Sequence, residues 1–154
     1  MSITLEKIQS LNISLPKPTT PVANYVGYVK SGNMVFISGQ LPIKDGELQF
    51  IGKVGKEISI EDATKAAQLC TINILSQLND ACANNLDKVK KCIKLGIFVN
   101  GIEEFADHPK VANGASDLIA DIFGDKGKHA RAAVGSGSLP FNVSVEVDAI
   151  FEIE

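Results

Sequence analysis

Residues 143–154 read "VSVEVDAIFEIE", and this stretch decides the fold because apolar and polar side chains alternate along it. An alternation with a period of two residues indicates a β-strand that turns one face toward a hydrophobic core. Ile150 interrupts the polar face, which indicates that this face meets something other than bulk water. The pattern therefore predicts a sheet with one face on the core and a second face that is polar but not fully solvated. The core side is formed by Val143, Val145, Val147, Ala149, Phe151 and Ile153.

Two helical patterns lie upstream of this strand. Across residues 59–83, apolar residues recur at steps of three and four, which predicts one helix with a buried stripe. Ser59, followed three residues later by an acidic residue, is typical of a capping box. A second helix is predicted over residues 109–123, with Asp107 as its N-cap. Between the two helices, "IKLGIFV" at residues 93–99 is predicted to be a continuous apolar strand.

The segment before the first of these helices is typical of strands and loops. Residues 24–43 hold two β-rich runs separated by a Ser-Gly-Asn turn, which predicts a hairpin. A third short strand is expected within residues 47–55. Residues 4–11 are expected to form a short helix, and the prolines of residues 15–21 then impose a loop.

The resulting order of elements, ββ(β)αβαββ, predicts an α+β fold. In such a fold two main helices cover one face of a mixed sheet of about six strands. The length of 154 residues fits one domain over residues 1–154, in which residues 1–21 supply the N-terminal helix and the Pro-rich loop. The uncovered face of the sheet must then meet solvent or another subunit, so an oligomer is a hypothesis.

The composition narrows the classes of protein that this chain fits. Hydrophobic residues make up 45% of the chain and charged residues 21%, which is typical of a globular protein. A net charge of −3, with no basic stripe, argues against a nucleic-acid partner. No secretory signal pattern and no apolar run of membrane-spanning length is found, so we expect a cytoplasmic protein without a membrane partner.

The cysteines and histidines do not form a recognisable metal-binding pattern. Cys70, Cys82 and Cys92 are odd in number and lack a CxxC spacing, so we expect buried free thiols rather than disulfides or a zinc site. His108 and His129 are too few for a His-rich site. We therefore expect neither a metal nor another cofactor.

One arginine stands at the head of a run of small residues, "HARAAVGSGSLP" at residues 129–140. A guanidinium in such surroundings needs an anionic partner. For Arg131 this partner could be Asp148, Glu146, a carboxylate of a neighbouring subunit, or a bound ligand. The "GSGS" run at residues 135–138 lacks the lysine and the context of a phosphate-binding loop, which argues against nucleotide binding.

Several motifs together give the chain a resemblance to a known family. The motifs are "SGQLP" at residues 38–42, the arginine strand around Arg131, and the Leu139-Pro140 turn that leads into "VEV" at residues 145–147. From about Val22 onward the chain resembles the reactive-intermediate deaminase (RidA/YjgF/L-PSP) family, in a divergent branch that contains "HPKVANGASDL" and "HARAAVG". The resemblance implies a chorismate-mutase-like homotrimer with the sheets facing inward and ligand sites in the clefts between subunits.

The resemblance also implies a reaction and the residues that perform it. The reaction is hydrolysis of enamine/imine intermediates such as 2-aminoacrylate to a 2-keto acid and ammonia. Arg131 matches the arginine that pairs with the substrate carboxylate, and Glu146 matches the carboxylate that orients the water. Tyr25 matches a tyrosine of the N-terminal strand that borders the cleft. We expect Arg131 and Glu146 to lie on adjacent strands.

Other positions match the binding part of the family pattern or depart from it. Ser38 and Gly39 match a turn whose backbone approaches the ligand, and Asn113 matches a helix asparagine. Ala133 stands at a ligand-contacting position where typical members have a cysteine, and Gly135 stands where they have a glutamate. The chain thus has Arg131 to bind a carboxylate, but it lacks the cysteine thiol that the family pattern has at position 133.

Three functions remain open on these grounds. The first is a hydrolase acting on small imine or enamine acids. The second is a module that binds small carboxylate metabolites without turnover, which Ala133 favours. The third is an endoribonuclease of the L-PSP type, against which the acidic charge balance and the missing basic channel count.

Overall fold

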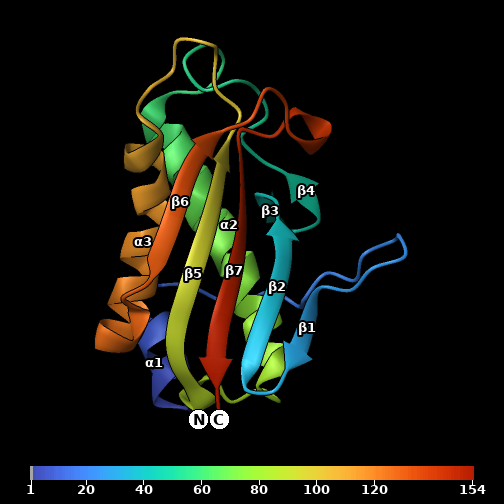
Figure 1. Cartoon of the computed structure of the whole chain (residues 1–154), viewed down its shortest axis with the longest axis vertical. Helices are drawn as coiled ribbons and strands as arrows, with labels where there is room; N and C mark the ends of the chain where they lie inside the picture. Colours follow the sequence, from blue (N-terminus) through green and yellow to red (C-terminus); the bar gives the residue numbers. More distant parts are fainter. Residues whose placement is uncertain (1) are drawn as a thin grey trace.

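The computed structural model describes residues 2–154, and a mixed sheet of five strands forms its framework (Figure 1). The strands run in the order β1-β2-β7-β5-β6. All neighbouring pairs are antiparallel except β5 and β6, which are parallel. The order places β5 between β6 and β7. The strands are β1 (Tyr28–Ser31), β2 (Met34–Gln40), β5 (Val89–Val99), β6 (Ala130–Gly135) and β7 (Val145–Ile153).

Two long helices, α2 (Ile60–Ala81) and α3 (His108–Phe123), lie on one face of this sheet (Figure 1). A third and shorter helix, α1 (Ile3–Ser10), packs at the end of α3. The core lies between the helices and the sheet, and Leu75 and Ile97 are fully buried there. The expectation of two main helices on one face is confirmed. The described residues also form three short 3-10 turns: η1 (Leu86–Lys88), η2 (Gly124–Gly127) and η3 (Pro140–Asn142).

The last strand, β7, confirms the alternation predicted from the sequence. Each odd-numbered residue from Val145 to Ile153 is buried, and each even-numbered residue is half-buried. The odd-numbered side chains face the helices, because α2 packs against this strand. Glu146 and Asp148 therefore lie on the opposite face of the sheet, which no helix covers (Figure 1). We call it the open face.

The expected sheet of about six strands is wrong in one respect. The third short strand is β4 (Glu47–Leu48), and it pairs only with β3 (Ile43–Lys44) in a separate two-stranded hairpin. The register of β2 with β7 shifts between Ile37 and Gln40, which bends the strand. Pairing resumes at Gln40 and Val147 and ends there, two residues before Pro42, which has no backbone N–H to donate to a sheet. The chain therefore leaves the main sheet before β3 begins.

The two predicted helix caps have different outcomes. Ser59 caps α2, because its Oγ accepts a hydrogen bond of 3.1 Å from the backbone N–H of Asp62. Asp107 occupies the N-cap position of α3, but its side chain makes no cap hydrogen bond. Its carboxylate instead lies 3.6 Å from Nζ of Lys110. The predicted N-cap position of Asp107 is therefore confirmed, whereas the side-chain hydrogen bond typical of such a cap is not formed.

The three cysteines are buried and free, as predicted. Burial raises the pKa of the Cys92 thiol to about 12 and also raises the pKa values of Cys70 and Cys82. Within residues 2–154 no three His, Cys, Asp or Glu side chains gather into a metal-binding group. In the same residues, no helix combines the length and the apolar character needed to cross a membrane.

Candidate functional site

Arg131 lies on β6, the edge strand beside α3. It pairs in register with Leu95 of β5, whose side chain is fully buried on the helix side of the sheet. Paired residues of parallel strands point to the same face, so Arg131 also points toward the helix layer. At the sheet edge this direction brings the exposed guanidinium against α3.

The guanidinium of Arg131 donates three hydrogen bonds, all to uncharged oxygen atoms. Nη1 donates to Oδ1 of Asn113 at 2.8 Å and to Oγ of Ser116 at 3.1 Å. Nη2 donates to the carbonyl oxygen of Pro109 at 3.5 Å. No ion pair found within residues 2–154 involves Arg131. The ion pairs with Asp148 or Glu146 that the sequence left open are thus not formed.

The free donors of Arg131 lie on one edge of its planar group. Among residues 2–154, no hydrogen bond from Nε is found, and Nη2 makes only the long one to Pro109. The Nε–H and the adjacent Nη2–H form a parallel pair of donors that matches the two oxygens of a carboxylate. The arrangement can therefore hold a small organic acid. We call Arg131, Asn113, Ser116 and Ala133 the arginine cluster.

Ala133 and Gly135 follow Arg131 on the same face of β6, and their surroundings explain their small size. Ala133 is half-buried and packs against the core. At Gly135, a Cβ atom would lie 2.9 Å from Nε2 of His108. That imidazole packs edge-on against Phe105 at a ring distance of 5.0 Å. His108 thus occupies the space that a larger side chain at position 135 would need.

A second group of predicted residues gathers around the bend of β2. Tyr25, Ser38 and Gly39 line a cavity of about 200 Å³. Oγ of Ser38 donates to the carbonyl oxygen of Val26 at 2.7 Å, which ties β2 to the loop that carries Tyr25. The expected strand position of Tyr25 is wrong: this residue lies in the bend before β1 and is 60% exposed. Tyr28 is the strand aromatic, and its hydroxyl donates to Asp80.

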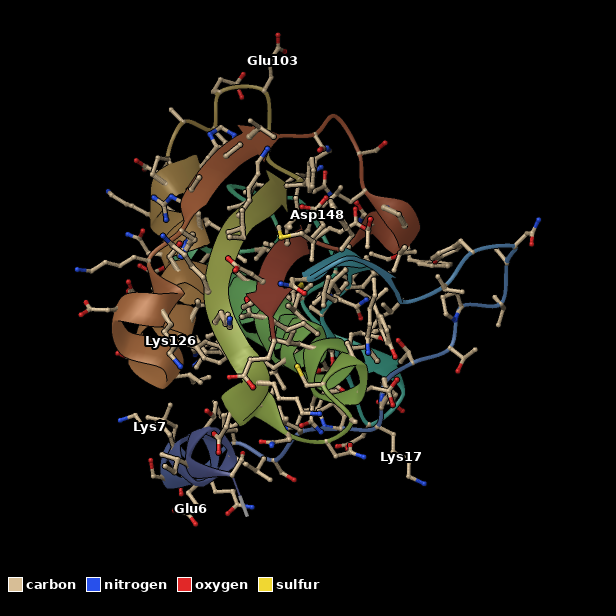
Figure 2. All side chains as sticks on the ribbon, turned by 60° about the horizontal axis from the view of Figure 1, so that its bottom comes forward. Glu6, Lys7, Lys17, Glu103, Lys126 and Asp148 are labelled. Atoms are coloured by element: carbon tan, nitrogen blue, oxygen red, sulfur yellow. The ribbon has the colours of Figure 1, made fainter. Side chains whose placement is uncertain are left out.

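Glu146 adjoins this cavity through Gly39. A Cβ atom at position 39 would lie 2.8 Å from Oε1 of Glu146, so only glycine lets the carboxylate lie against this backbone. Burial raises the pKa of Glu146, and the nearby charge of Asp148 raises it further. Figure 2 shows Asp148 over the sheet, whereas the other labelled charged residues lie at the periphery. A raised pKa makes the carboxylate a stronger base, which suits a group that accepts a proton from water. We call Tyr25, Ser38, Gly39 and Glu146 the glutamate cluster.

The structure does not bring the two clusters together within one chain. Glu146 pairs with Phe98, and Phe98 pairs with Val134, so β5 separates Glu146 from the strand of Arg131. Two strand spacings and three residues along β6 place the two Cα atoms roughly 14 Å apart. Their side chains also lie on opposite faces of the sheet. The expectation of adjacent strands is therefore wrong, because β5 enters the sheet between β6 and β7.

Two members of the Arg131 surroundings were not found from the sequence. Ser116 lies three residues after Asn113, a spacing that puts both side chains on one face of α3. His129 lies two residues before Arg131, and its Nε2 lies 2.9 Å from Oγ of Ser116. Both spacings are visible in the sequence. Their meaning depends on the packing of α3 against β6, which the sequence pattern does not specify.

Comparison with known proteins supports the fold and places the chain in a family. It is 44% identical to Protein TCP17 of Trypanosoma cruzi over 147 residues, covering 95% of this chain and 91% of that protein. It is 28% identical to a 2-iminobutanoate/2-iminopropanoate deaminase of Dermatophagoides farinae over 143 residues, covering 92% of this chain and 95% of that protein. The crystal structure of Atu1372 from Agrobacterium tumefaciens matches with a TM-score of 0.93 at 45% identity, covering 98% of this chain and 92% of that one.

The fold is therefore the α+β chorismate-mutase-like fold expected from the sequence, with a mixed sheet and three helices. The profile of the family described as "YjgF/chorismate_mutase-like, putative endoribonuclease" matches residues 6–153. This match spans nearly the whole chain. The protein belongs to the YjgF/chorismate mutase-like family.

Proposed function

We propose that this protein is a hydrolytic deaminase of small enamine and imine acids of the 2-aminoacrylate type. The observation that carries the proposal is the state of Arg131. Neutral acceptors on α3 hold its guanidinium, no carboxylate of residues 2–154 pairs with it, and its Nε makes no hydrogen bond to them. Such a fork suits the carboxylate of an amino-acid-derived intermediate.

The site is proposed to form between copies of the chain. Arg131 and Glu146 lie too far apart, and on opposite faces, to act together on one small molecule within a chain. We propose that the arginine cluster of one subunit meets the glutamate cluster of its neighbour in a homotrimer. A closed ring of this kind repeats one heterologous contact three times.

The open face supports this assembly. A depression of about 560 Å³ on it is lined mostly by apolar side chains of β1, β2, β5, β6 and β7. Val29, Phe36 and Val134 are between 44% and 53% exposed there. The loop before β1 carries the exposed Val22 and Tyr25 and projects away from the sheet (Figure 1). Apolar side chains exposed together in this way mark an interaction surface.

The proposed reaction adds water to the C=N carbon of a 2-imino acid. Arg131 holds the substrate carboxylate, and Glu146 orients the water and accepts its proton as the oxygen bonds to carbon. Glu146 passes this proton to the nitrogen, which gives a carbinolamine. The hydroxyl group then loses its proton as the C=O bond forms, the nitrogen takes up this second proton, and the C–N bond breaks to release ammonia. The products are a 2-keto acid and ammonia, so one imine and one water are consumed. Positioning of the two reactants supplies much of the acceleration.

The experiment is a coupled assay in which an added dehydratase generates 2-aminoacrylate and the release of pyruvate is followed. Wild-type protein should accelerate release, Arg131→Ala should fall to background, and Glu146→Gln should lose about a hundredfold in rate. Lys90→Ala and Glu152→Gln, which change exposed or half-exposed charges on neighbouring strands, serve as matched controls and should behave as wild type. Equal rates for wild type and Arg131→Ala would refute the proposal.

Ala133 favours one alternative, a module that binds small carboxylates without turnover. Pyruvate titrated against the protein separates the two functions. Binding that depends on Arg131, together with no acceleration by wild-type protein, would select the binding module. Binding accompanied by acceleration supports the deaminase.

A further inference from the structure

A chain of hydrogen bonds connects His129 to Arg131 on the helix side of β6. Nδ1 of His129 lies 2.6 Å from the carbonyl oxygen of Gly127. A carbonyl oxygen can only accept, so Nδ1 carries the hydrogen. Nε2 of the same ring lies 2.9 Å from Oγ of Ser116. In the neutral ring Nε2 is then an acceptor, and the Ser116 hydroxyl donates to it.

The direction of the hydrogen bond between Ser116 and His129 determines whether the Ser116 hydroxyl can accept a hydrogen bond from Arg131. Since the hydroxyl hydrogen of Ser116 points to His129, its oxygen lone pairs remain for other donors. Nη1 of Arg131 donates to this oxygen at 3.1 Å and to Oδ1 of Asn113 at 2.8 Å. Both hydrogens of Nη1 are therefore engaged. Every donor in the chain from Gly127 to Asn113 meets an acceptor.

Both ends of this chain are fixed by α3. Ser116 and Asn113 belong to the helix, and Gly127 packs directly on it, because a Cβ atom at Gly127 would lie 2.5 Å from the carbonyl oxygen of Ile119. The carbonyl oxygen that orients His129 is thus held by backbone packing.

We infer that Ser116 and His129 are positioning residues for Arg131, and that they turn its Nε–H and Nη2–H edge toward the substrate carboxylate. This inference rests on the proposed function. His129 selects the donor direction of Ser116, and Ser116 occupies the second hydrogen of Nη1. Rotation of the guanidinium would break both Nη1 bonds, so the free edge is preorganised.

The first test is spectroscopic and needs no turnover. In the ¹⁵N NMR spectrum of wild-type protein labelled at histidine, the neutral ring of His129 should carry its hydrogen on Nδ1 and none on Nε2. Ser116→Ala should shift the Nε2 resonance of His129, whereas Ser138→Ala, an exposed serine, should leave it unchanged. A ring of His129 protonated at Nε2, or a resonance unaffected by Ser116→Ala, would overturn the inference.

The second test measures pyruvate affinity by titration and the KM and kcat values of the coupled assay. Ser116→Ala and His129→Leu should each weaken pyruvate binding about tenfold and raise KM more than they lower kcat. His129→Gln, whose amide oxygen can accept from Ser116, should restore most of the affinity. Unchanged affinity in the folded His129→Leu variant would overturn the inference. Wild-type protein that neither binds pyruvate nor accelerates its release would instead refute the proposed function, while the NMR result for His129 stands independently.

Discussion

At the scale of single residues, the proposed chemistry is assigned to two charged side chains, Arg131 and Glu146. The sequence indicated that Arg131 needs a partner and that Glu146 belongs to an acidic strand face. It could not indicate that neutral groups of α3 hold Arg131, because those contacts join residues far apart in the chain. Glu146 is half-buried, and no ion pair found within residues 2–154 involves it.

Glu146 leads to a prediction about stability and pH. Burial, with the charge of Asp148, raises the pKa of Glu146 in the folded state above its ordinary value in the unfolded chain. The folded state therefore binds this proton more tightly. This contribution is fully present below about pH 4 and is lost as the pH rises through the folded pKa. Glu146→Gln should thus unfold at a higher temperature than wild type at pH 7.5.

The Glu146→Gln advantage should shrink toward zero at pH 4, as measured by thermal unfolding at both values. Glu152→Gln, on the same face of β7, is the matched control. A Glu146→Gln variant that is less stable than wild type at pH 7.5 would contradict the assigned environment of the carboxyl group.

At the scale of helices and strands, the sequence predicted elements whose burial follows a simple period. β7 and α2 were predictable because one face of each is buried along its whole length. Apolar residues therefore recur every two residues in the strand and every three to four residues in the helix. The separate hairpin β3–β4 was not predictable, because the sequence pattern indicates a short strand but not the strand with which it pairs. The position of Tyr25 was missed since apolar character alone does not distinguish an exposed arm from a strand.

The caps of α2 and α3 provide a matched pair of variants. Ser59→Ala removes the hydrogen bond to the N–H of Asp62 and should lower the free energy of unfolding by about 1 kcal/mol. Asp107→Ala removes no cap hydrogen bond and breaks only an exposed ion pair, so its effect should stay below about 0.5 kcal/mol. Urea denaturation measures both values. A larger loss for Asp107→Ala than for Ser59→Ala would contradict the observed caps.

At the scale of the whole molecule, the strand order controls what one chain can do. β5 lies between β6 and β7, and it separates the arginine cluster from the glutamate cluster. The motifs of both clusters could be recognised in the sequence. Their separation could not, because strand order results from how the chain crosses the sheet rather than from any local pattern.

This separation predicts complementation between two inactive variants. Coexpression of Arg131→Ala with Glu146→Gln should yield mixed trimers in which some sites combine an intact Arg131 with a neighbour's intact Glu146. With equal amounts and random assembly, about one quarter of the sites are intact, so about one quarter of wild-type activity should return. The coupled assay measures it. Activity that remains at the level of the single variants would show that the two residues do not act across subunits.

The burial of all three cysteines has a consequence for oxidative stress. Cys70, Cys82 and Cys92 lie in the core with raised pKa values, and the arginine cluster, with Ala133, contains no thiol. Alkylating agents and peroxides attack accessible thiolates. The folded residues 2–154 present no accessible thiolate to these agents. Sulfenic acid formation and glutathionylation of these cysteines are therefore not expected to inhibit the folded protein.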